Sequence, residues 1–265
     1  MQLPTYSMLH LERPAPHVLK VSFNRPEVMN AINTQTGHDL LDLWTRLTVD
    51  PADIRCVILT GAGDKAFCAG GDLKERNGMT NATWQAQHEL FERAFVALVE
   101  CPTPVIAAVN GVAYGGGCET ALGCDFIYAA EHARFALSEA RLGIMPGGGG
   151  TQTLARAVGE RRAKELITTA RAFSARQACD WGMVNEVVPG TELLDRVLAT
   201  AAEIAANAPL SVRQAKKSIH YGLQTDLLTG YRLEIEAYNR LVTTEDRLEG
   251  VRAFNEKRKP NFQGR

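Results

Sequence analysis

The stretch VIAAVNGVAYGGGCETALGCD, residues Val105–Asp125, decides the fold. It begins with five apolar residues, turns at Asn110, and reaches three glycines, Gly115–Gly117, before a run suited to a helix. This order predicts a strand, a turn and a glycine-rich entry into a helix. The first N–H groups of a helix are unpaired and carry a partial positive charge, and glycines let a ligand approach them closely.

Glu119 follows Gly116 by three residues, so both lie on one face of the predicted helix. This short segment therefore offers a backbone donor for a developing oxyanion and a carboxylate for proton transfer. The alternative is a tight turn in which Glu119 only favours the helix dipole. The stretch by itself does not decide between the two interpretations.

The composition argues against several classes of partner. The chain has 265 residues, 45% of them hydrophobic, and a formal net charge of −1. This balance is ordinary for a globular protein and argues against a nucleic-acid or membrane-surface partner. Because the sequence has neither a run of about 18 apolar residues nor a signal-peptide pattern, we expect no membrane span and a cytoplasmic location.

The cysteines and histidines form no metal-binding motif. Six cysteines occur without a CxxC pair, and the six histidines lack the clustered spacing of a zinc site. The cysteines lie mainly in apolar or glycine-rich segments, which is typical of reduced, partly buried thiols in a cytosolic protein. We therefore expect no metal.

The chain alternates between short apolar strands and helices and then becomes mostly helical. The expected strands are 17–23, 54–60, 105–109, 125–129, 133–136 and 184–188. The expected helices are 34–49, 83–100, 151–158, 160–169, 174–181, 192–207, 210–221, 227–243 and 244–257, besides the one that follows the three glycines. This repeated unit predicts an α/β fold with largely buried sheets.

A second glycine-rich bend contains Gly71, whose backbone N–H belongs to the same kind of turn as that of Gly116. If successive units stack in register, the two N–H groups converge on one oxygen and form an oxyanion hole. Losing one such donor costs about 3–4 kcal/mol of transition-state stabilisation. The sequence alone does not establish the convergence.

Two glutamates, Glu119 and Glu139, each follow a strand and adjoin a glycine-rich bend. Two carboxylates that face one cavity can divide acid and base roles, because like charges separate their proton affinities. Otherwise they are surface or capping residues. The quartet Gly147–Gly150 also allows two interpretations. It could bind an anion at the start of a helix, or it could serve only close packing and a helix cap.

Several segments resemble the enoyl-CoA hydratase/isomerase (crotonase) family. The main ones are FCAGGDL at 67–73, AVNGVAYGGGCE at 108–119 and PGGGGTQ at 146–152, with further matches at 24–26, 30–33, 246–250 and 253–258. The resemblance spans roughly residues 18–265. It implies a spiral of repeated ββα units over 1–205 and a helical region, 206–265, that forms a homotrimer, with trimers often pairing into hexamers.

The resemblance also implies a role for each matching residue. The N–H groups of Gly71 and Gly116 polarise the thioester carbonyl of an acyl-CoA, and Glu119 and Glu139 form the catalytic pair. The family often has alanine at the position of Gly71, which is a mild departure because only the backbone is used. The residues expected along the adenine and pantetheine path are Ala69, Gly70, Asp72 and Leu73.

Within this resemblance, the presence of both glutamates favours an enoyl-CoA hydratase. One glutamate, which we expect to be Glu139, protonates C2, and the other, Glu119, orients or deprotonates the attacking water. The order of the two roles stays open at this point, because a coupled pair titrates as a unit. No metal or redox cofactor is implied, because CoA is part of the substrate. One alternative is a relative that acts on a branched or functionalised acyl-CoA, such as a methylglutaconyl-CoA-type hydratase, a carnitinyl-CoA-type dehydratase or an isomerase. Another is a catalytically silent acyl-CoA-binding scaffold.

Two groups of residues allow two readings each. Trp84, Phe91 and Phe95 have helical spacing that favours the hydrophobic core over an acyl pocket. Arg25 and the basic tail at 257–259 favour a solvated surface over contacts with CoA phosphates.

Overall fold

A computed structural model describes residues 4–265, and its core contains two sheets. The larger has six strands in the order β1-β2-β3-β5-β7-β10, and the smaller has four in the order β4-β6-β8-β9. The strands are β1 (Leu9–Ala15), β2 (Val18–Phe23), β3 (Cys56–Gly61), β4 (Ala66–Cys68), β5 (Val105–Val109), β6 (Val112–Tyr114), β7 (Phe126–Ala130), β8 (Arg134–Ala136), β9 (Phe173–Ser174) and β10 (Glu186–Val188).

The helices agree with the expected ones to within two residues at each end. They are α1 (Thr34–Val49), α2 (Leu73–Arg76), α3 (Asn81–Val99), α4 (Gly116–Gly123), α5 (Gly150–Val158), α6 (Glu160–Thr169), α7 (Ala175–Asp180), α8 (Leu193–Ala206), α9 (Pro209–Gly222), α10 (Leu227–Val242) and α11 (Glu245–Asn255), with the 3-10 helices η1 (Pro26–Val28) and η2 (Glu139–Leu142). Among the helices, only the short helix α2 and the 3-10 turns lack a counterpart in the sequence-based expectation. Among the strands, β1, β4, β6 and β9 were not expected.

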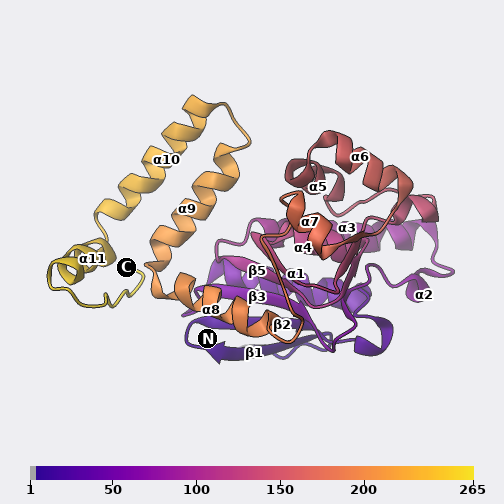
Figure 1. The fold of residues 1–265 in the computed structure, drawn as a ribbon, viewed down its shortest axis with the longest axis horizontal. Coiled ribbons are helices and arrows are strands. Elements are labelled where there is room, and N and C mark those ends of the chain that lie inside the picture. The colour runs from indigo at the N-terminus through magenta and orange to yellow at the C-terminus, as the bar shows by residue number, and fades with distance from the viewer. Residues whose placement is uncertain (1–3) are drawn as a thin grey trace.

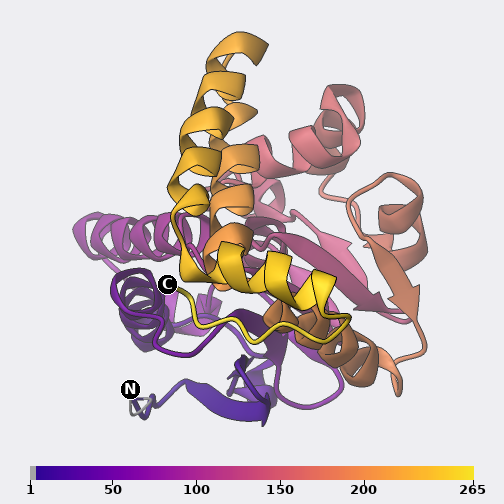
Figure 2. The same cartoon turned by 90° about the vertical axis from the view of Figure 1, so that its left-hand side faces the viewer.

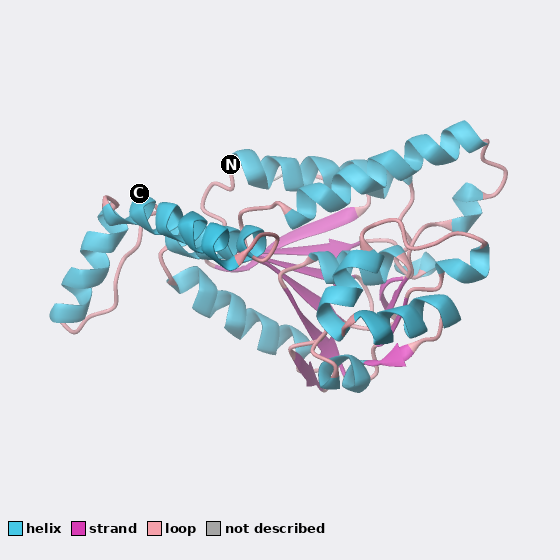
Figure 3. Ribbon diagram, turned by 90° about the horizontal axis from the view of Figure 1, so that it is seen from above, coloured by secondary structure: helices cyan, strands magenta, loops and turns pink. Residues whose placement is uncertain are grey.

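The larger sheet is parallel from β2 to β10, and only the edge strand β1 pairs antiparallel. Helix α8 packs against β3, β5 and β7, and β4 of the second sheet contacts β3 and β5. Seen from above, the strands fan out between helices on both sides (Figure 3). Strands β3 and β5 are therefore buried on both faces, which explains their continuous apolar sequences.

The second sheet brings two glycine-rich turns together. Strands β4 and β6 pair in parallel, with Cys68 opposite Ala113, so the turns that follow them leave the sheet at the same edge. The successive units β3-β4-α3, β5-β6-α4 and β7-β8-α5 confirm the expected spiral of ββα repeats. The pairing has a register shift between Ala66 and Cys68, and the turns that carry Gly71 and Gly116 follow its last paired residues.

Helices α9 and α10 form a hairpin that extends from one side of the core, and α11 lies beyond it (Figure 1). Figure 2 shows the C-terminal segment running back along α11. It is fastened to the core where Arg55 donates a 2.7 Å hydrogen bond to the carbonyl of Phe262. The division at residue 205 stays a prediction.

Within residues 4–265, each helix falls short of the length or the apolarity that a bilayer crossing requires.

Candidate active site

A cavity of about 560 Å³ lies where α1, α3, α4 and the two glycine-rich turns meet. Of the residues expected at the site, Ala69, Gly70, Gly71, Leu73, Gly116, Glu119 and Glu139 line it. These side chains and amides come from three successive ββα units. The spiral therefore brings together residues that lie up to seventy positions apart in the chain.

The backbone N–H groups of Gly71 and Gly116 lie close together in this cavity. A Cβ atom on Gly70 would lie 3.2 Å from the nitrogen of Gly116, and one on Gly116 would lie 3.9 Å from the nitrogen of Gly71. Gly70 and Gly115, which precede the two donors, have φ values of +93° and +50°, and glycine adopts this region without strain. Among residues 4–265 neither N–H has an acceptor, so both are free for a ligand.

Glu119 is on α4, one turn after Gly116, and only 5% of it is exposed. Its Oε1 atom accepts hydrogen bonds of 2.8 Å from the backbone N–H groups of both Gly148 and Gly150. Burial raises the pKa of Glu119, and these two hydrogen bonds oppose the rise. The glycine quartet thus does cradle an anion, and that anion is the protein's own carboxylate.

The quartet also packs closely around this carboxylate. A Cβ on Gly148 would lie 3.0 Å from Glu119 Oε2, and a Cβ on Gly150 would lie 2.9 Å from Oε1. Only glycine at these positions lets the loop and the carboxylate approach without displacement. We call residues 147–150 the glycine strap. It fixes one oxygen of Glu119, while Oε2 has no hydrogen-bond partner among the described residues.

Glu139 opens the 3-10 helix η2 and is 8% exposed. Within residues 4–265 its Oε2 atom is buried and has no hydrogen-bond partner. Burial raises the pKa of Glu139 to about 7, and the charge of Glu119 adds to the rise. The two carboxyl groups therefore differ, because two amides hold Glu119 whereas the side chain of Glu139 has an unsatisfied oxygen.

Asp72 has a different place from its neighbours. Its side chain caps α2 by accepting from the N–H groups of Lys74 and Glu75, and it forms a 2.9 Å ion pair with Arg25. It is absent from the cavity lining. The sequence favoured a solvated surface for Arg25, and this expectation is wrong. The Arg25 side chain is only 17% exposed and also donates a hydrogen bond to the carbonyl of Ala31. This pair fastens the loop that carries Gly71.

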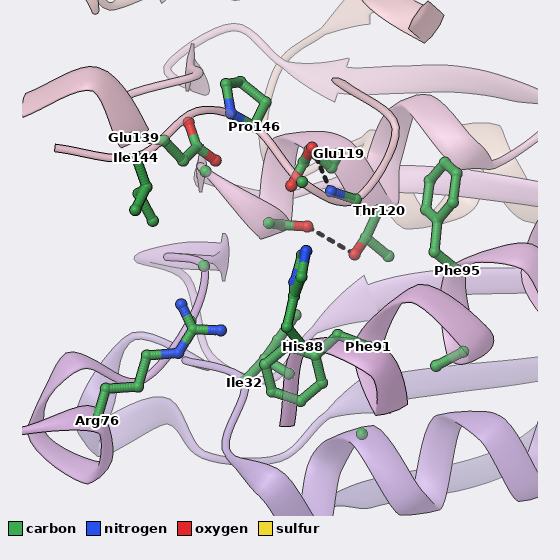
Figure 4. Close-up of a pocket in the computed structure, with 18 of the residues that line it drawn as sticks. Ile32, Arg76, His88, Phe91, Phe95, Glu119, Thr120, Glu139, Ile144 and Pro146 are labelled. Carbon is green, nitrogen blue, oxygen red and sulfur yellow. Dashed lines mark hydrogen bonds between the residues drawn. The ribbon is translucent and has the colours of Figure 1, made fainter. Parts of the chain in front are cut away.

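The aromatic residues of α3 correct another expectation. Trp84, Phe91 and Phe95 all line the cavity, and Phe91 packs against the core as well. Two polar residues near them, His88 and Arg76, also line it and were not singled out from the sequence. Figure 4 shows His88 in the middle of the cavity and Arg76 at one end. His88 shares the helical spacing of the aromatics, which is the one signal that could have identified it.

These features define a site that can polarise a carbonyl oxygen and move protons beside it. Two free backbone N–H groups lie close together, and two buried carboxyl groups of different proton affinity line the same cavity.

Comparison with known proteins agrees with this chemistry. The model of the enoyl-CoA hydratase/isomerase family matches residues 14–265, so the chain belongs to that family. It is 42% identical to a crotonyl-CoA hydratase from Syntrophomonas wolfei, over 90% of this chain and 92% of that one. It is also 42% identical to a short-chain-enoyl-CoA hydratase from Clostridium acetobutylicum, over 91% and 92%. The crystal structure of an enoyl-CoA hydratase from Bacillus anthracis superposes with a TM-score of 0.95, at 44% identity, over 98% of this chain and 100% of that one.

Proposed function

We propose that the protein is an enoyl-CoA hydratase, which adds water reversibly across the 2,3-double bond of an enoyl-CoA thioester to give a 3-hydroxyacyl-CoA. The observation that carries the proposal is the meeting of two free N–H groups with two buried carboxyl groups in one cavity. The names of the relatives support it, since two are hydratases of short enoyl-CoA thioesters.

The oxyanion hole follows from the charge that develops in this reaction. Water attacks C3, and negative charge collects on the thioester oxygen as an enolate forms. The N–H groups of Gly71 and Gly116 donate to that oxygen, and Gly116 also lies at the N-terminus of α4, where the helix dipole favours negative charge. Each donor contributes about 3–4 kcal/mol to such a transition state.

The environments of the two carboxyl groups support an assignment of roles. Glu139, with a pKa of about 7, retains a proton near neutral pH and donates it to C2. Glu119 is held by two amides through Oε1, so its other oxygen accepts a proton from the attacking water. General acid–base catalysis of this kind contributes about 10²- to 10⁴-fold to the rate.

The remaining expectations form part of the same proposal. The reaction needs no metal or redox cofactor, since the two N–H groups polarise the thioester carbonyl and CoA belongs to the substrate. Six free cysteines support a reducing, cytoplasmic location. A homotrimer or a hexamer is supported by the exposed apolar residues of α10, which are Leu227, Leu228, Tyr231, Ile235 and Tyr238.

The experiment measures loss of the conjugated thioester absorbance when purified protein is mixed with crotonyl-CoA and a panel of branched and functionalised enoyl-CoA thioesters. We expect hydration of at least one of them. Glu119→Gln should lower kcat by about 10²- to 10⁴-fold, whereas Glu131→Gln, an exposed residue after β7, should leave it unchanged. Absence of hydration across the whole panel would favour a silent acyl-CoA-binding scaffold, and full activity of Glu119→Gln would remove Glu119 from the mechanism.

A further inference from the structure

Arg76, the last residue of α2, has a guanidinium group inside an otherwise mainly apolar part of the cavity. Its Cζ atom lies 4.4 Å from the centre of the Trp84 ring and 5.5 Å from that of Phe91. Figure 4 shows the guanidinium directed into the cavity, with Glu139 and Ile144 on the opposite wall. The two aromatic rings hold a flat cation in a defined position.

One hydrogen bond orients this group. Nε of Arg76 donates at 2.7 Å to Oε1 of Gln87, which is only 4% exposed. The amide of Gln87 in turn donates to Thr34 and to Glu75, both at 2.8 Å. The hydrogen bonds of Gln87 therefore fix the orientation of the Arg76 guanidinium, and with it the direction in which its remaining N–H groups point.

The two terminal nitrogens of Arg76 have no partner within residues 4–265. No carboxylate among these residues lies within 4.0 Å of the guanidinium. The adjacent Glu75 is committed elsewhere, because its carboxylate accepts from the N–H of Thr34 at 2.9 Å and from Gln87. Arg76 is thus a half-buried cation whose outer donors face a cavity.

Such an arrangement costs free energy unless a ligand completes it. Burial disfavours the charged form and lowers the pKa of Arg76, yet an arginine side chain stays protonated in proteins. A guanidinium with two free terminal nitrogens fits a planar carboxylate, which it binds through two parallel hydrogen bonds. An uncharged acyl chain would leave these donors desolvated and unpaired.

We propose that Arg76 binds a carboxylate at the far end of the acyl group, so that the preferred substrate is a short 2-enoyl thioester with a free carboxylate at the end opposite the thioester. This inference rests on the proposed hydratase function and names the substrate class of the same site. Arg76 is a specificity residue in it, and the reacting atoms remain with Gly71, Gly116 and the two glutamates.

The position of Arg76 limits the length of the acyl chain. A Cβ atom on Gly71 would lie 3.3 Å from Arg76 Cζ, so the guanidinium carbon is within about 5 Å of the Gly71 Cα atom. The thioester oxygen bound to the N–H of Gly71 and a carboxylate bound to Arg76 are then only a few bonds apart. A five- or six-carbon acyl group satisfies both contacts, whereas a long one would have to fold back.

The test compares crotonyl-CoA with glutaconyl-CoA, which has the same double bond and a terminal carboxylate. For the wild type we expect kcat/KM at least tenfold higher with glutaconyl-CoA. Arg76→Met should lower kcat/KM for glutaconyl-CoA by about 10- to 100-fold, the value of a charge-assisted hydrogen bond, and change that for crotonyl-CoA by less than about threefold. Arg76→Lys keeps the positive charge but cannot form two parallel hydrogen bonds to a carboxylate, so its kcat/KM for glutaconyl-CoA should lie between those of the wild type and Arg76→Met. Arg93→Met, which removes an exposed arginine of α3, is the matched control for net charge.

Two other roles for Arg76 give different results. If it contacts a CoA phosphate, Arg76→Met lowers activity equally with both CoA thioesters and leaves the corresponding pantetheine thioesters unaffected. If it supports the oxyanion or the fold, all substrates lose activity equally. Either result overturns the proposal, and so does a wild type that does not prefer glutaconyl-CoA.

A binding measurement separates this inference from the proposed reaction. Glutaryl-CoA and butyryl-CoA are saturated and cannot be hydrated, so calorimetry with them does not depend on turnover. We expect glutaryl-CoA to bind at least tenfold more tightly than butyryl-CoA, with the difference lost in Arg76→Met. Tighter binding of glutaryl-CoA without hydration of any enoyl thioester would overturn the hydratase function alone. Equal binding of the two would overturn the role of Arg76 alone.

Discussion

Replacement of Glu139 by glutamine is expected to stop turnover and to make the stability of the fold less dependent on pH. Burial raises the pKa of Glu139 from 4.5 to about 7 in the folded protein. A carboxyl group with a raised pKa contributes stability that is fully present below the unfolded pKa and is lost as pH rises through the folded pKa. Wild-type protein should therefore lose stability from about pH 4.5 to pH 7, and the variant should not lose this part.

The magnitude follows from proton linkage. A pKa that changes from 4.5 to about 7 on folding gives a loss of about 2.5 kcal/mol between pH 5 and pH 8. Solvent in the cavity screens part of the effect, which reduces the expected value to about 1–2 kcal/mol. The glutamine amide brings its own cost in this buried position, but that cost is independent of pH and cancels when the two pH values are compared.

The assay is urea unfolding followed by tryptophan fluorescence at pH 5 and pH 8. Protein concentration is held fixed, because assembly of subunits would make stability depend on it. The free energy of unfolding of Glu139→Gln, relative to wild type, should rise by about 1–2 kcal/mol from the lower to the higher pH. Glu131→Gln, which removes an exposed carboxylate, is the control and should show no such rise. Identical pH dependence in wild type and Glu139→Gln would refute the raised pKa.

The same proton governs activity. The proposed mechanism uses the protonated form of Glu139, so kcat/KM of the wild type should fall above about pH 7. A kcat/KM that keeps rising through pH 8 would mean that another group donates the proton to C2.

Two further substitutions test how the site is supported. Gly148→Ala places a Cβ 3.0 Å from Glu119 Oε2, so the carboxylate must move. We expect kcat to fall by about tenfold or more with little change in KM. The control is Gly222→Ala in α9, where the added Cβ has its nearest neighbour at 3.8 Å and should not affect kcat. An unchanged kcat in Gly148→Ala would contradict a positioning role for the strap. Asp72→Asn keeps a good helix cap but removes the ion pair with Arg25, and urea unfolding should show a loss of about 1–3 kcal/mol. The control is Glu165→Gln, which removes the exposed ion pair between Glu165 and Arg171 and should lower the free energy of unfolding by less than about 1 kcal/mol. Equal losses in the two variants would mean that the Asp72 pair does not fasten the loop.

The sequence predicted the longer elements well because their local signals agree. Helix α1 begins and ends where expected, since Asn33 accepts from the N–H of Thr36 as a cap and Pro51 follows the helix. Strand β1 was not expected, because LHLERPA carries charged residues and only Leu9 is buried. It is an edge strand held by antiparallel pairing with β2, and such pairing depends on the partner rather than on apolar content.

The site could be predicted as far as it depends on repetition. Gly71 and Gly116 occupy equivalent turns in neighbouring units, so parallel pairing of β4 with β6 is enough to bring them together. The contacts of Glu119 with the glycine strap and the direction of Arg76 depend instead on packing between elements far apart in the sequence. No local pattern marks Arg76 as a cavity residue, since an arginine at the end of a short polar helix is normally solvated.

The difference between the two glutamates sets the protonation state from which hydration begins. In the free protein, two amides favour an ionised Glu119, and its negative charge in turn favours a protonated Glu139. In the proposed mechanism hydration consumes this arrangement, because the proton of Glu139 goes to C2 and that of water goes to Glu119. The product complex is therefore left with the opposite arrangement, which the glycine strap disfavours. Return of the proton restores the starting state before the next turnover, and the strap makes that return favourable.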